Sequence, residues 1–129
     1  MNPQAGIPFY AEGGPLLRGQ AVTTGTNRDQ VKLSGSANAL IVGFVINDAL
    51  EGQEVAIFPV NAGGKCKAIA GASFNAGVFL ELEGTDGRVT EITSDNTLRY
   101  ACGISLEAGD DGQLVDILPL AFVGFTSLT

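Results

Sequence analysis

The side chains best suited to chemistry in this sequence are carboxylates, which gather in two glycine-containing turns. Paired carboxylates can hydrolyse glycosides or bind calcium. Glycosidases usually stack their sugar on aromatic side chains, whereas this chain has no Trp and only 2 Tyr, and Asp110-Asp111-Gly112 lacks the alternate ligand spacing of a calcium loop. We therefore interpret the acidic residues as ordinary turn residues, with weak cation binding as the alternative. One turn contains Asp48, Glu51 and Glu54, and the other contains Glu107, Asp110, Asp111 and Asp116.

Nucleophilic and metal-dependent chemistry lack their usual residues. The absence of His removes Ser-His and Cys-His catalysis, His-ligated zinc and the commonest general base. The only cysteines are Cys66 and Cys102, and we expect packed, free thiols rather than a disulfide. Residues 61–66 are close to the end of a phosphate-binding loop, but Pro59 stands where glycine is required and Cys66 where Ser or Thr is required. The sequence therefore predicts no enzyme, no cofactor and no bound metal.

Length, charge and hydropathy describe one small acidic protein. A chain of 129 residues suits a single domain with a real core. The net charge of −7 repels phosphate, and the 7 basic residues are not interleaved with aromatic side chains as in nucleic-acid-binding barrels. The longest apolar run, residues 39–46, is too short to span a membrane, and the first residues lack the features of a signal peptide. We expect neither nucleic acid nor a membrane as a partner.

A stretch of 17 residues occurs twice and organises the predicted fold. Residues 43–59 align without a gap on residues 103–119, with 6 identities at a constant separation of 60 positions. The identities fall in an apolar run, after an acidic turn, in an alternating strand and at its terminal proline, so each copy is expected to form strand, turn and strand. The identical pairs are Gly43 and Gly103, Gly52 and Gly112, Gln53 and Gln113, Val55 and Val115, Ile57 and Ile117, and Pro59 and Pro119.

Short apolar stretches separated by turn residues continue along the rest of the chain. Residues 77–83 and 88–93 alternate in polarity on either side of Asp86-Gly87, which is a strong hairpin signal. Glycine is about twice as frequent as usual, and no segment shows a sustained helical period. We predict an all-β fold: a compact β-barrel or β-sandwich of about ten short strands with internal strand-turn-strand duplication, formed by a single domain over residues 21–129.

Residues 1–20 differ from the rest in composition. They contain Pro3, Pro8 and Pro15 with glycines interleaved, a mixture that disfavours helices and central strands. Apolar side chains in the same stretch predict an extended N-terminal arm that docks on its own domain or on a neighbour, with a frayed terminus as the alternative. We expect a deletion of residues 2–17 to leave a folded domain that no longer attaches to its partner. The candidate contact residues of the arm are Ile7, Phe9, Tyr10, Leu16, Leu17 and Arg18.

Four short segments occur in an order that resembles a family of phage proteins. They are residues 74–78 (FNAGV), 86–89 (DGRV), 103–108 (GISLEA) and 112–117 (GQLVDI). This order is similar to that of the small phage-encoded capsid decoration, or cement, proteins, in which an Asp-Gly turn and a Gly-Ile/Val-Ala-Leu-Glu-Ala segment precede a glycine turn and a valine-rich strand. The resemblance covers roughly residues 40–120 and leaves the N-terminal stretch outside.

The resemblance implies a non-enzymatic viral structural protein of a bacteriophage. Such a protein is made in the host cytoplasm, decorates the outer capsid surface of the virion as a homotrimer at three-fold and quasi-three-fold positions, and stabilises the capsid by joining neighbouring subunits of the major capsid protein. In that case the partners are the major capsid protein and other copies of this chain. The alternative is a β-domain binding module on a virion or tail that recognises carbohydrate or protein through loops such as residues 25–29 or 94–97.

Overall fold

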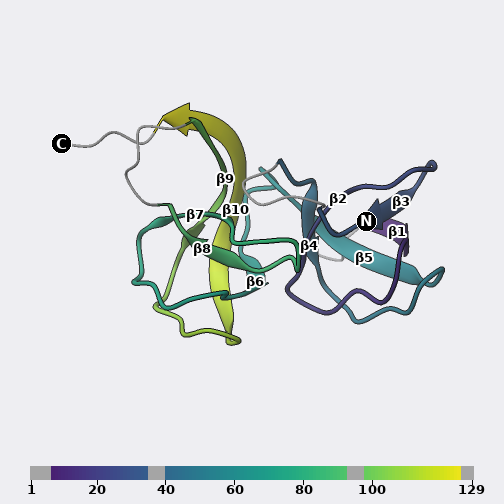
Figure 1. Cartoon of the computed structure of the whole chain (residues 1–129), viewed down its shortest axis with the longest axis horizontal. Coiled ribbons are helices and arrows are strands. Elements are labelled where there is room, and N and C mark those ends of the chain that lie inside the picture. Colours follow the sequence, from purple (N-terminus) through teal and green to yellow (C-terminus); the bar gives the residue numbers. More distant parts are fainter. Residues whose placement is uncertain (1–6, 35–39, 93–97, 126–129) are drawn as a thin grey trace.

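A computed structural model describes residues 7–34, 40–92 and 98–125 of the chain, and all of its regular elements are β-strands (Figure 1). Side chains are described for these residues except positions 7, 8, 98 and 122–125. The prediction of an all-β fold of about ten short strands is confirmed. The strands are β1 (Ile7–Ala11), β2 (Ala21–Thr24), β3 (Gln30–Lys32), β4 (Gly43–Val45), β5 (Glu54–Pro59), β6 (Cys66–Ile69), β7 (Phe79–Leu82), β8 (Val89–Glu91), β9 (Leu98–Ser105) and β10 (Leu114–Phe125).

The strands divide into two halves that lie side by side (Figure 1). The first half is a closed barrel with the strand order β1-β3-β2-β4-β5. The second half is a five-stranded sheet with the order β6-β10-β9-β7-β8, and an isolated parallel bridge between Ala70 and Val89 links its two edges. If β1 to β5 are matched in turn with β6 to β10, each pair of neighbouring strands in the barrel has a matching pair in the second sheet. The two halves therefore have the same topology.

The internal duplication is confirmed, and it is larger than the sequence indicated. Gly43 pairs with Pro59 in the first half as Gly103 pairs with Pro119 in the second. Beyond the repeated segments, β1 pairs antiparallel with β5 as β6 pairs with β10, and β2 pairs with β3 and β4 as β7 pairs with β8 and β9. The whole five-strand unit is therefore present twice, including strands whose sequences show no similarity.

The repeated Gly-Gln builds the same turn in both halves. The side-chain oxygen of Gln53 accepts a hydrogen bond from Leu50 N at 2.9 Å, and that of Gln113 accepts one from Asp110 N at the same distance. Gly52 and Gly112 have φ values of 81° and 87°, in the left-handed region that favours glycine. The two identities are therefore explained by turn geometry.

The core joins the halves into one body. Eight buried apolar residues fill the barrel, but Ala21, Ile41 and Phe44 of the first half pack into the core of the second. Backbone hydrogen bonds cross the same boundary, from Ala21 N to Gly87 O at 2.9 Å and from Ile69 N to Gly19 O at 3.0 Å. The halves are therefore held together by both apolar packing and hydrogen bonds.

The described residues of the N-terminal stretch pack on their own domain, one of the two expected alternatives, but they do so as a strand of the barrel between two others, which the composition did not predict. Strand β1 pairs with β5 over residues 7–10 and with β3 at Tyr10 and Ala11. Proline is tolerated in this strand because Pro8 faces Ala56, which bonds to other residues. The Ala56 N–H donates to Asn47 Oδ1 and its C=O accepts from Ile46 N, so β5 requires no hydrogen bond to Pro8. Leu16, also expected in the arm, is 1% exposed in the barrel core.

Candidate binding groove between the two halves

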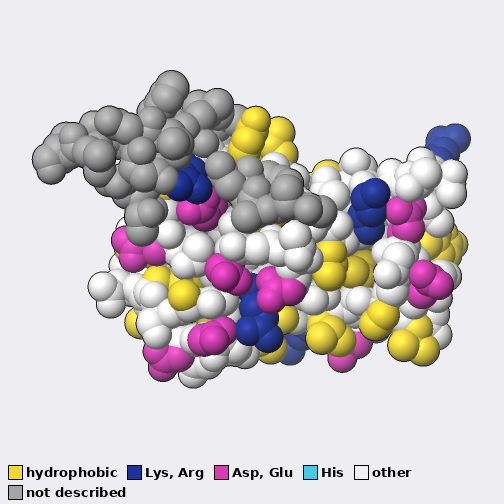
Figure 2. Space-filling view, viewed as in Figure 1, with side chains coloured by type: hydrophobic (Ala, Val, Ile, Leu, Met, Phe, Trp, Pro, Cys, Tyr) yellow, Lys and Arg dark blue, Asp and Glu magenta, His cyan; other side chains and the backbone are white. Residues whose placement is uncertain are grey.

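Several acidic side chains of the two turns are engaged in hydrogen bonds or ion pairs with nearby residues. Asp48 Oδ1 accepts a hydrogen bond from Arg18 N at 2.7 Å, and Glu107 Oε2 accepts one from Asp116 N at the same distance. Asp110 accepts a hydrogen bond from Ser73, and Asp111 is paired with Arg88 at 3.0 Å. Within the described part of the chain, no three His, Cys, Asp or Glu residues form a group suited to holding a metal ion. Figure 2 shows acidic side chains spread over this face of both halves, most basic ones lying against them.

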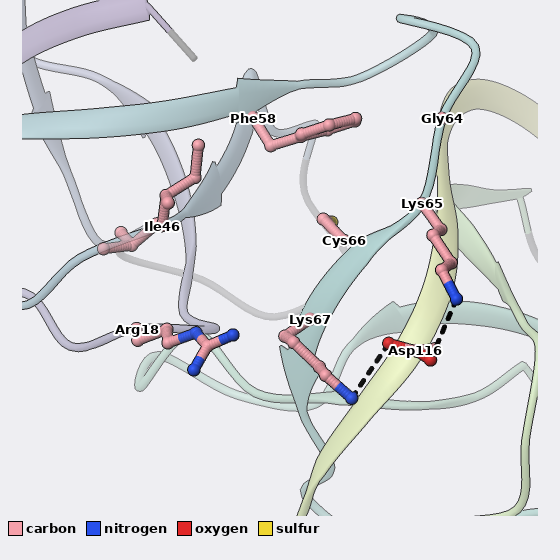
Figure 3. Close-up of a pocket in the computed structure, with 9 residues that line it drawn as sticks. Arg18, Ile46, Phe58, Gly64, Lys65, Cys66, Lys67 and Asp116 are labelled. Atoms are coloured by element: carbon pink, nitrogen blue, oxygen red, sulfur yellow. Dashed lines mark ion pairs between the residues drawn. The ribbon is translucent and has the colours of Figure 1, made fainter. Parts of the chain in front are cut away.

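A groove of about 350 Å³ lies where the two halves meet (Figure 3). Strand β6 contributes Cys66 and Lys67, β10 contributes Asp116, and the segment before β6 contributes Gly64 and Lys65. The opposite wall comes from the first half and consists of Arg18, Val45, Ile46 and Phe58. We call this site the seam groove. The wall from the first half is apolar apart from Arg18, and the wall from the second half contains the charged groups of Lys65, Lys67 and Asp116.

Two lysines hold the single carboxylate of the seam groove. Lys67 Nζ lies 2.9 Å from Asp116 Oδ1, and Lys65 Nζ lies 3.5 Å from Asp116 Oδ2 (Figure 3). The hydrogen bond from Lys67 and the positive charges of both lysines lower the pKa of Asp116. The guanidinium of Arg18 has no ion pair among the described residues. The lining therefore has three cationic side chains around one carboxylate.

The thiols do not supply a nucleophile. Burial, with a smaller contribution from the charge of Asp116, raises the pKa of Cys66 to about 12. Cys102 is fully buried, and burial also raises its pKa well above the ordinary range for a thiol. Both cysteines are free, as the sequence led us to expect. At neutral pH both thiols are protonated, that of Cys102 in the core and that of Cys66 partly buried in the groove wall.

The structure separates the predicted arm contacts from one another. Phe9 packs against the barrel core, Leu16 is buried in it, and only Tyr10, Leu17 and Arg18 remain substantially exposed. Ile7 lies in β1, and its side chain is outside the described set. Of the repeat residues, Gly43 and Gly103 are buried in strands, while Gly52, Gln53, Gly112 and Gln113 are exposed in the turns.

Sequence reasoning missed the seam groove, although two of its features were visible. Lys65 and Lys67 are the one close pair of basic residues, but no aromatic residue stands beside them in sequence. Phe58 breaks the alternation of its strand. The fold brings these features together, because Phe58 lies against Gly64, where an added Cβ would be 3.1 Å from the ring. Of the two predicted recognition loops, residues 25–29 form an exposed turn, and residues 94–97 lie outside the described residues.

The fold defines a class of all-β proteins composed of two five-stranded units in tandem, and comparison with solved structures finds this fold in a phage protein. No family model matches the chain, and no curated protein matches it. The chain is similar to the head fiber gp8.5 N base of bacteriophage phi29, with a TM-score of 0.66 and 19% sequence identity. The alignment covers 88% of this chain and 91% of the phi29 chain. At this identity the similarity establishes the fold.

No helix of the described residues is long and apolar enough to cross a membrane.

Proposed function

We propose that the protein is a non-enzymatic structural component of a phage virion that attaches to the outside of the icosahedral head. The observation that carries the proposal is the agreement of fold with a phage head fiber base over 88% of the chain. The resemblance of residues 74–117 to capsid decoration proteins supports the same class from the sequence. In the finer form of the proposal, a homotrimer occupies three-fold and quasi-three-fold positions and joins neighbouring subunits of the major capsid protein.

The physical character of the chain supports attachment rather than catalysis. The thiols are protonated, the carboxylates of Asp48 and Glu107 accept backbone hydrogen bonds, and that of Asp111 is paired with Arg88. The two halves share an apolar core and so form a single unit, which can contact more than one neighbouring subunit through different surfaces. A protein that binds only the assembled shell stabilises it by mass action, and a trimer multiplies weak contacts into avidity.

The proposal is tested by adding the purified protein to expanded phage heads that lack it. Co-sedimentation, followed by imaging of the particles, is expected to show added density at three-fold and quasi-three-fold positions on the outer surface. Light scattering of the free protein measures its mass against the 13.2 kDa of one chain, and a mass three times larger is expected for the trimer. Heads that remain bare at saturating protein concentration would contradict attachment.

A second function is favoured by the turn between β2 and β3. Residues 26–29 are all exposed at one end of the barrel, and Asp29 has a left-handed φ of 62° (Figure 1). An exposed turn of this kind suits a recognition loop for carbohydrate or protein on a virion appendage. Replacing residues 26–29 with glycine and serine separates the two functions, because head attachment is expected to survive this change and loop-mediated recognition is not.

A further inference from the structure

The seam groove continues into a second hollow along the boundary between the halves. Arg18 lines both depressions, and the second one is also lined by Leu17, Asp48, Ile69, Gly112 and Leu114. Leu17 and Leu114 are 50% and 42% exposed, so two large apolar side chains remain accessible beside the arginine. Arg18 thus lies between the apolar side chains of the seam groove, which include Phe58, and the leucine side chains of the second hollow.

The charges of this region contrast with those of the whole chain. The net charge of the protein is −7, yet 3 of its 7 basic residues line the seam groove. Asp116 holds Lys67 firmly at 2.9 Å, whereas Lys65 is more distant and its side chain is 67% exposed. The carboxylates at the margin are already bonded, Asp48 to Arg18 N and Glu107 to Asp116 N. Arg18 and Lys65 are therefore the groups best able to accept a further anion.

We propose that the seam groove binds a carboxylate side chain of a partner polypeptide, with the apolar neighbours of that side chain held against Phe58 and Ile46 on one side and Leu17 and Leu114 on the other. A guanidinium pairs with a carboxylate through two parallel hydrogen bonds, which gives the site direction as well as charge. The inference rests on the proposed function, in which the partner is the major capsid protein, and adds that the bound segment of that partner is acidic and apolar.

The surroundings of the site favour a polypeptide over a nucleic acid. A nucleic-acid groove follows a row of phosphates with many cations and stacks the bases on aromatic side chains. Here only three cationic side chains line one short groove, carboxylates border them, and Phe58 is 7% exposed and so forms a wall rather than a stacking platform. A single carboxylate flanked by apolar groups matches this arrangement in both charge and polarity.

The probe is a pair of synthetic peptides, acetyl-Leu-Glu-Phe-amide and acetyl-Leu-Gln-Phe-amide, titrated into the full 15N-labelled chain. The Glu peptide is expected to shift the backbone amides of Arg18, Ile46 and Lys67. The Gln peptide and the Arg18→Gln variant are each expected to raise the Kd about tenfold, which corresponds to the loss of a charge-assisted hydrogen bond. Arg28→Gln, which removes an exposed arginine from the β2–β3 turn, is the matched control and should leave the Kd unchanged.

Two outcomes would overturn the site. The first is the absence of localised shifts at 10 mM Glu peptide, a concentration chosen roughly from the weakest useful affinities. The second is tighter binding of hexathymidylate at the same amides, which would identify a phosphate site. Thermal unfolding of Arg18→Gln should match the wild type, because its guanidinium has no ion pair in the described chain.

Binding to phage heads distinguishes the site from the proposed function. If the Glu peptide binds and the protein does not attach to heads, the groove stands and the coat protein is not its partner. If wild type and Arg18→Gln attach equally well to heads and the peptide does not bind, the function stands and the groove is not the contact. Loss of head attachment in Arg18→Gln, with Arg28→Gln unaffected, supports both together.

Discussion

The two halves share one hydrogen-bonding scheme and differ in the side chains they place on it. Ala21 of β2 and Phe79 of β7 hold equivalent positions: Ala21 pairs with Phe44 and Phe79 with Ile104, the residues that follow the repeated glycines. Ala21 is fully buried, and its small side chain lets its N–H reach Gly87 O of the second half at 2.9 Å, whereas Phe79 is 50% exposed. The two halves thus share the same strand pairing, but the position of Ala21 is buried against the second half, whereas the equivalent position of Phe79 is exposed.

The second half also carries a structure that the first lacks. β9 and β10 are 8 and 12 residues long, against 3 and 6 for β4 and β5, so the hairpin of the second half continues beyond the repeated unit. Arg99 of this extension reaches Glu81 on β7 at 3.0 Å, and the Glu81 side chain is only 8% exposed. Thr23 holds the place of Glu81 in the first half. Changes made in one half at a time test these differences between the halves.

Deletion of residues 2–17 is expected to have the largest effect, and the structure reverses the expectation from sequence that this deletion leaves a folded domain. It removes β1, which pairs with both β3 and β5, together with Leu16 of the barrel core. Truncating Leu16 alone to alanine is expected to cost about 2–5 kcal/mol of unfolding free energy, so the longer deletion should abolish cooperative unfolding in urea, followed by circular dichroism. Deletion of residues 2–6 leaves every described contact in place and serves as the control. A cooperative transition in the longer deletion would show that β1 is dispensable.

Arg99→Met is expected to destabilise the second half next most strongly. It leaves the Glu81 carboxylate buried without its cation, a change that costs about 3–5 kcal/mol in buried pairs. Lys32→Met, which breaks the longer and more exposed pair with Glu12 in the first half, should change the urea midpoint little. The double variant Glu81→Gln with Arg99→Met should recover part of the loss. Equal effects of the two single variants would contradict the difference in burial.

Alanine at the repeated strand glycines is expected to destabilise both halves unequally. A Cβ at Gly43 would meet the carbonyl oxygen of Phe58 and lie 2.5 Å from Ile57 Cγ2, whereas at Gly103 the nearest atoms are at 2.9 and 3.0 Å. Overpacking of this kind costs about 1–3 kcal/mol, with the larger loss at Gly43. Thermal unfolding of Gly43→Ala and Gly103→Ala compares them directly. The reverse order would mean that the first half relaxes more easily than its packing indicates.

The smallest expected effect concerns the seam groove. Lys67→Gln removes the strongest interaction that lowers the pKa of Asp116, so that pKa should rise toward its ordinary value. Because the folded-state pKa is depressed, the contribution of Asp116 to stability is present above its unfolded pKa and is lost as the pH falls through the folded pKa. Carboxyl 13C titration of wild type and variant measures the change. The first half has Ala56 at the equivalent position and offers no such titration. An unchanged titration would mean that Lys65 holds Asp116 alone.

Local signals in the sequence were sufficient for the strands and turns. Gly52-Gln53 and Gly112-Gln113 were found because a left-handed turn and its side-chain acceptor require particular residue types at adjacent positions. The N-terminal stretch was misjudged for the opposite reason. Prolines usually exclude a central strand, but Pro8 lies where neither neighbouring strand requires its N–H, a fact that depends on register with β5.

The sequence alone determined the all-β class, the strand-turn-strand duplication and the residues that build the turns, because each depends on neighbours a few positions apart. That the duplication extends over five strands per half is visible in the three-dimensional pairing and not in the sequence, since β1 and β6 share the pairing scheme without sharing residues. The structure also decided that Arg18 and Phe58 face Lys65, Lys67 and Asp116 across one groove. These residues are distant in the chain, and only the packing of one half against the other brings their charges and apolar surfaces together.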